Sequence, residues 1–64
     1  MSNDLLKYLS DKIQEERGII TEDTALGKAK DFGDYKYACG IVRGLLIANN
    51  LIIETAQRME TDND

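Results

Sequence analysis

A row of small residues, Gly40, Gly44 and Ala48, recurs at every fourth position inside the most apolar stretch of this chain. Residues four apart lie on one face of a helix, so the row would form a groove along a helix surface. Each interior glycine costs a helix about 1 kcal/mol relative to alanine. A helix that keeps two of them generally needs another backbone close against that face. The row therefore points to packing and partners.

The length of the chain, 64 residues, allows one domain, residues 1–64. A chain this short buries only about 60% of the surface that its unfolded form exposes, so it is marginally stable alone. Cys39 is the only cysteine and there is no histidine, which excludes an internal disulfide and makes a conventional zinc site implausible. We therefore expect a homo-oligomer, or docking on a larger protein assembly.

Charge and hydropathy argue against two classes of partner. The net charge of −4 has the wrong sign for a phosphate-binding surface, so we expect no direct nucleic-acid binding. The apolar run over 41–53 is interrupted by Arg43, Asn49 and Asn50 and is shorter than the ~20 residues of a spanning helix. We expect no membrane contact. The polar, acidic amino terminus has no secretory pattern, so we expect a protein that is not secreted.

Apolar residues at spacings of three and four predict a first helix over about 3–17. Leu6, Leu9 and Ile13 would form its buried stripe, with Ser2 or Asn3 as the cap. Gly18 is suited to end this helix at its C′ position. Residues 20–30 show no strong period, and we expect a partly ordered connector whose Leu26, together with Phe32, lies on the core.

A second helix is predicted over about 32–60, with the carboxylate of Asp31 capping the amide of Asp34. Residues 61–64 would form a frayed acidic tail. The fold class is therefore all-α, a two-helix antiparallel hairpin. The core stripe of the second helix alternates by three and four throughout. Its members are Ala38, Ile41, Leu45, Ala48, Ile52, Thr55 and Met59.

The second helix has more apolar residues than one seam can bury. At 1.5 Å per residue it would be roughly 40 Å long and the first helix about 23 Å, so the first would cover little more than half of it. Exposed aliphatic side chains forgo about 1.5–3 kcal/mol each, which favours completion by another subunit. The candidate interface residues are Gly40, Arg43, Gly44, Ile47, Ala48 and Leu51, with Val42, Leu46 and Ile53 on a second face. The alternative is that the glycines admit only the first helix or Phe32 within one subunit.

The sequence contains no catalytic constellation, and we expect neither an enzyme nor a cofactor. Histidine, the commonest general base, is absent, and Cys39 reads as a buried structural thiol. Arg43 would either reach solvent or an acidic residue of the same hairpin, or bind a carboxylate on a neighbouring molecule. Asn49 and Asn50 could fix the register of a helical assembly or simply lie on the outside of the helix.

The stretch from Asp34 to Leu45 resembles a segment of short phage-encoded proteins, with a likeness that extends over about residues 31–60. The matching positions are Tyr37, Gly40, Arg43, Gly44 and Leu45. The resemblance implies a virion-associated structural or assembly component, located in the virion or the host cytoplasm, and supplies no catalytic residues. The alternative function is a small acidic binding module that inhibits or redirects a host protein through a basic surface.

Overall fold

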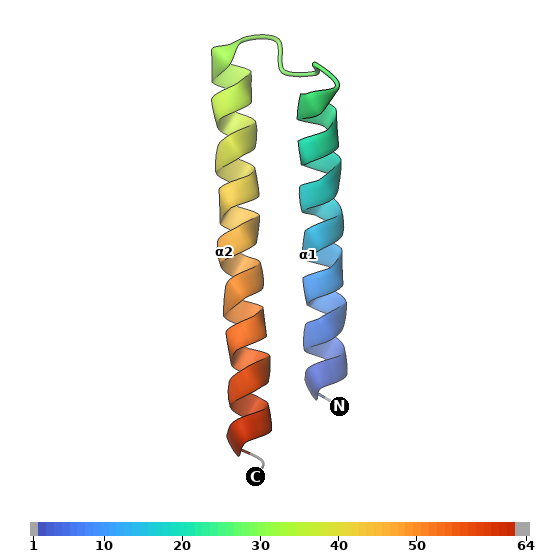
Figure 1. Cartoon of the computed structure of the whole chain (residues 1–64), viewed down its shortest axis with the longest axis vertical. Coiled ribbons are helices and arrows are strands. Elements are labelled where there is room, and N and C mark those ends of the chain that lie inside the picture. Colours follow the sequence, from blue (N-terminus) through green and yellow to red (C-terminus); the bar gives the residue numbers. More distant parts are fainter. Residues whose placement is uncertain (1, 63–64) are drawn as a thin grey trace.

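The computed structural model describes residues 2–62, and side chains from residue 4 to residue 60. Two helices, α1 (Ser2–Ala25) and α2 (Phe32–Asp62), run antiparallel and lie side by side as a hairpin (Figure 1). The molecule measures 50 × 15 × 11 Å. The predicted all-α hairpin is confirmed. The expected cap at Ser2 or Asn3 and the acidic tail over 61–64 lie outside the described side chains.

The seam between the helices follows a repeat of three and four on both sides. The partly buried residues of α1 in this repeat are Leu6, Ser10, Ile13, Arg17, Ile20 and Thr24. On α2, the predicted stripe is partly buried at Ala38, Ile41, Leu45, Ala48, Ile52 and Met59. Two residues that were expected in the seam do not lie in it. Thr55 is exposed and Ala56 is partly buried in its place, while Leu9 is 41% exposed because Ser10 takes the seam position.

The first helix does not end at Gly18, as the sequence analysis expected, but continues for seven more residues. The seam repeat explains this, because Ile13, Arg17 and Ile20 keep facing α2 while Gly18 lies off the seam. Ile19 therefore stays in the helix and is 50% exposed. With 24 residues, α1 is about 36 Å long and runs along most of α2, not half of it.

The end of α1 is a Schellman motif built on Gly27. The amide of Lys28 donates to the carbonyl of Asp23 at 3.1 Å, and the amide of Gly27 donates to that of Thr24 at 3.1 Å. Gly27 has φ +84°, in the left-handed region that glycine adopts without a Cβ penalty. The connector is therefore the turn over residues 26–31, shorter than the expected 20–30, because residues 20–25 belong to α1.

The start of α2 is capped as predicted. The Oδ1 atom of Asp31 accepts a hydrogen bond from the amide of Asp34 at 2.8 Å, and the Oδ2 atom of Asp34 accepts one from the amide of Lys30 at 3.1 Å. The expected core contacts of Leu26 and Phe32 are wrong, since the two side chains are 69% and 72% exposed. Leu26 lies in the turn and Phe32 is the first residue of α2.

Replacing Gly18 in α1 and Gly27 in the turn by alanine should have opposite effects on the free energy of unfolding. Gly18→Ala should raise the free energy of unfolding by about 0.5–1 kcal/mol, because Gly18 is inside a helix and an added Cβ meets no atom within 4 Å. Gly27→Ala should lower it by about 1–2 kcal/mol, because alanine is strained at positive φ. Urea unfolding followed by circular dichroism measures both. Destabilisation by Gly18→Ala would contradict the continuous α1.

Candidate interaction surface

The hairpin has no enclosed hydrophobic core. Among the described residues no hydrophobic side chain is buried, and the single buried residue is a polar one, Asn49, at 8% exposure. The seam residues are only partly covered because each helix has one neighbour and is open to water on both flanks. A helix apolar over much of its circumference requires more than one neighbour. Any functional surface of this chain must therefore be sought on the open flanks.

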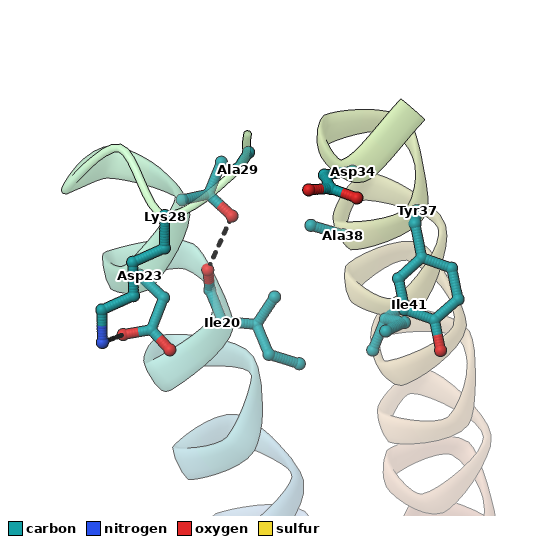
Figure 2. A pocket seen from close by; sticks show the side chains of 9 residues that line it. Ile20, Asp23, Lys28, Ala29, Asp34, Tyr37, Ala38 and Ile41 are labelled. Carbon is teal, nitrogen blue, oxygen red and sulfur yellow. Dashed lines mark hydrogen bonds and ion pairs between the residues drawn. The ribbon is translucent and has the colours of Figure 1, made fainter. Parts of the chain in front are cut away.

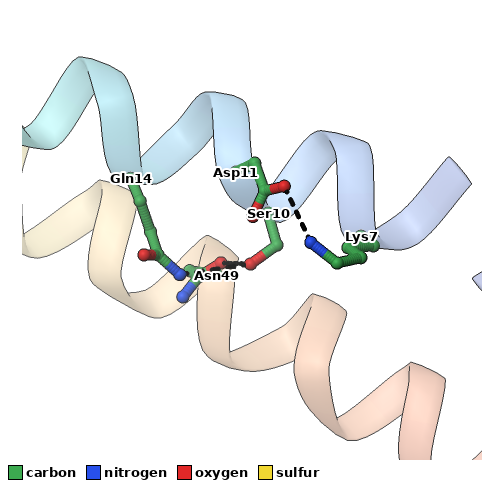
Figure 3. Close-up of polar contacts among 5 residues, drawn as sticks. All are labelled: Lys7, Ser10, Asp11, Gln14 and Asn49. Carbon is green, nitrogen blue, oxygen red and sulfur yellow. Dashed lines mark hydrogen bonds and ion pairs between the residues drawn. The ribbon is translucent and has the colours of Figure 1, made fainter. Parts of the chain in front are cut away.

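Asn49 anchors the centre of the seam through a polar layer (Figure 3). The Ser10 hydroxyl donates to the Oδ1 atom of Asn49, and the Nε2 atom of Gln14 donates to the Ser10 oxygen at 3.4 Å. Nearby on the outer surface, Lys7 pairs with Asp11 at 3.1 Å. The interpretation of Asn49 as an outward-facing residue is wrong. Because a shifted register would separate Ser10 from Asn49, this layer fixes residue 10 at the height of residue 49.

Two open grooves flank the turn end of the seam. Figure 2 shows the first, where Ile20 and Ile41 point towards one another and Asp23 pairs with Lys28 at 3.2 Å. Tyr37 also lines this groove, and we call this flank of the hairpin the glycine side, because Gly44 follows Tyr37 by seven residues, two helical turns. The second groove is lined by Thr21, Ala25, Tyr35, Cys39 and Val42. We call that flank the cysteine side.

The predicted interface residues on the glycine side are open to solvent. Ile47 is 51% and Leu51 59% exposed, and a Cβ added at Gly40 or Gly44 would meet no atom within 4 Å. The alternative interpretation, in which the glycines admit α1 or Phe32 of the same subunit, is therefore wrong. Ala48 differs from the others, because it is partly buried in the seam.

The second predicted face lies on the cysteine side. Leu46 is 38% and Ile53 40% exposed, whereas Val42 is partly buried at the edge of the seam. Arg43 is exposed between the two flanks of α2 and forms no ion pair within the described part of the chain. Its guanidinium therefore reaches solvent, and the expected pairing within the hairpin does not occur.

Helix α1 also contributes to this surface, which the expected interface residues did not include. Leu5, Tyr8, Leu9 and Ile19 are 60%, 57%, 41% and 50% exposed. A second row with spacings of four and three contains Leu5, Leu9, Lys12, Glu16, Ile19 and Asp23. Since Asp23 lines the groove on the glycine side, the whole row lies on that side. On α1 the glycine side therefore carries Leu5, Leu9 and Ile19, with the charged Lys12 and Glu16 between Leu9 and Ile19 and the charged Asp23 at the turn. The same spacing is visible in the sequence, but the premature end at Gly18 concealed it.

The expectation that Cys39 is a buried thiol is wrong, because its side chain is exposed on the cysteine side. The pKa of the Tyr35 hydroxyl is raised above its ordinary value. The largest cause is a side-chain hydrogen bond with Cys39, and smaller ones are charge repulsion from Cys39 and desolvation. Within the described residues, no group of three or more cysteine or acidic side chains is placed to hold a metal ion.

By length and composition alone, α2 from Phe32 to Glu60 could cross a membrane, with a mean hydropathy of 1.3 in its most apolar window of 18 residues. Core helices of water-soluble proteins satisfy the same criterion but are mostly buried, whereas only 6% of this window is buried in the hairpin. In the hairpin, α2 lies along α1, whose charged residues (Lys7, Asp11, Lys12, Glu15 and Glu16 among them) would enter the hydrocarbon with it. Insertion of α2 would therefore require the hairpin to open.

No family model, curated protein or solved structure matches this chain. The resemblance to short phage proteins therefore stays a prediction. The candidate surface rests on the geometry of the hairpin alone.

Asn49 and Asn50 offer a matched test of the polar layer. Asn49→Ala should lower the free energy of unfolding by about 1–3 kcal/mol, because it removes a buried side chain and the partner of Ser10. Asn50→Ala, at an exposed position, should change it by less than about 0.5 kcal/mol. Chemical denaturation of the two variants in parallel provides the measurement. Equal effects would contradict the inward placement of Asn49.

Proposed function

We propose that this chain is a non-enzymatic assembly protein that acts by helix–helix packing, with one open flank of its hairpin covered by a second copy. The observation that carries the proposal is the absence of any buried hydrophobic side chain among the described residues. Large apolar side chains stay exposed on α1 and on α2 alike. Covering them supplies the hydrophobic stabilisation that one hairpin lacks.

The amount of exposed surface supports one further copy as the cover. The chain exposes 5177 Å². A compact monomer of 7.2 kDa is expected to expose about 4100 Å², so the excess is about 1000 Å². A stable interface between two proteins buries about 800 Å² on each partner. The excess per chain is therefore of the size that one dimer interface removes.

A phage setting, as a virion-associated or accessory component, is the context that the resemblance over residues 31–60 implies, and it is part of this proposal. The second candidate function, an acidic module that binds a basic surface of a host protein, depends on the net charge of −4. Salt distinguishes the two, because screening weakens charge-driven binding while apolar association persists or strengthens.

Light scattering coupled to size exclusion tests the assembly. At tens of micromolar the chain should elute as a dimer or larger species, and Gly44→Leu should weaken association at least tenfold, because the added side chain occupies the open face of α2. Gly18→Leu is the matched control, since it adds the same side chain at an open helical position on the polar flank of α1, and it should leave association unchanged.

Three outcomes would contradict the proposal. The first is a fully helical monomer at these concentrations. The second is an assembly that dissociates when NaCl is raised from about 0.1 to 1 M, which would favour the charge-driven module. The third is sedimentation of the chain with neutral phospholipid vesicles, which would assign the apolar surface of α2 to a membrane.

A further inference from the structure

We infer that two copies join through the glycine side with α2 packed antiparallel on α2, crossing at Gly44, so that the two turns lie at opposite ends of the dimer. The inference rests on the proposed function and specifies its geometry. Two observations support this geometry. One is the excess exposed surface of about 1000 Å² per chain, and the other is the exposure of large side chains on this side: Tyr37, Ile47 and Leu51 are 74%, 51% and 59% exposed. The glycines between them allow the backbones to approach closely.

The row on this side runs Tyr37, Gly40, Gly44, Ile47 and Leu51. Its two end members, Tyr37 and Leu51, each lie seven positions from Gly44. A two-fold axis through Gly44 reverses α2, so it sets Tyr37 of one copy against Leu51 of the partner subunit. The same axis sets Gly40 against Ala48 of the partner subunit. An isologous interface requires this kind of self-complementarity.

The competing arrangement, with both turns at one end, places α1 of one copy over α2 of the other at unchanged height. The hydrogen bond between Ser10 and Asn49 puts these two residues at the same height along the hairpin axis. Because the helices are antiparallel, each residue further along α1 lies level with one residue earlier in α2. Lys12 then lies level with Ile47, and Glu16 lies level with Arg43 and Gly44. This arrangement would press Lys12, which pairs with Glu15 of its own helix at 3.7 Å, and Glu16 onto the apolar and glycine part of α2, which costs desolvation of these charged side chains.

The antiparallel arrangement brings α1 onto α1 instead. An axis at the height of Gly44 crosses α1 near Glu15, because the heights of the two helices are tied at Ser10 and Asn49. Reversal about that point brings Lys12 within about one turn of Glu16 of the partner subunit, and the reciprocal pair forms by symmetry. Apolar residues thus meet apolar residues on α2, and on α1 each Lys12 lies near Glu16 of the partner subunit, with the two Glu16 side chains equally close to one another. Complementarity of this kind selects one orientation over another.

Distances between spin labels at the turn decide between the arrangements. In a Cys39→Ala background, Lys30→Cys places one nitroxide on an exposed turn position of each copy. Lys30 is about 14 residues from Gly44, roughly 20 Å along the axis, so the antiparallel dimer predicts a separation of about 40 Å by double electron–electron resonance. Turns at one end predict less than about 20 Å. The label at Arg43→Cys in the same background is the control, since it lies at nearly the same height in both copies in either arrangement and therefore reports the width of the dimer and not its length.

The outcomes separate this inference from the proposal beneath it. A distance near 40 Å at the turn with a shorter distance at position 43 supports the antiparallel dimer. A short distance at the turn overturns it and leaves the assembly intact. Absence of any dipolar coupling at both positions, with a monomeric mass by light scattering for the labelled protein and for the unsubstituted chain, overturns both the arrangement and the assembly.

Discussion

Two helices packed side by side share a single line of contact, and this geometric limit governs the rest of the molecule. Each helix of the hairpin presents one stripe to its partner and leaves two flanks in water. The seam side chains are therefore only partly covered, and the apolar residues beyond the seam are not covered at all. Stability and function become one question, because whatever covers the flanks also supplies the missing hydrophobic burial.

Within that limit, the polar layer at Ser10 and Asn49 gives the hairpin a defined register. An apolar seam tolerates sliding by one heptad, whereas a buried asparagine requires its partner at one height. The turn supports the same register from the other end through the Schellman motif at Gly27 and the cap at Asp31. A rigid hairpin presents its flanks in a fixed arrangement, as a specific interface needs.

The sequence was sufficient for the fold class, for α2 and for the cap at Asp31, because a long repeat of three and four and a capping carboxylate are local signals. It failed at the end of α1, since Gly18 followed by a polar stretch resembles a helix end. Only the continued contact of Arg17, Ile20 and Thr24 with α2 decides that the helix persists. It also failed for Asn49, Cys39 and Leu9. Which neighbouring residue faces the seam depends on the pairing of two helices, and one helical pattern does not fix that pairing.

The α2 part of the candidate surface was predictable from the sequence, and the α1 part was not. An excess of apolar positions on α2 indicates exposed flanks, and Ile47, Leu51, Leu46 and Ile53 are indeed exposed. The share of α1 in that surface required the true length of the helix and the height relation set by Ser10 and Asn49. These two facts place Lys12 and Glu16 of α1 between apolar residues of the same side.

The concentration dependence of thermal unfolding tests the central claim most directly, because association with a second copy stabilises the folded chain by mass action. Circular dichroism at concentrations from about 1 to 100 µM follows the loss of helix. Our account predicts a midpoint temperature that rises with concentration. A cooperative transition with the same midpoint across that range would show that one hairpin is sufficient by itself, and would contradict the account.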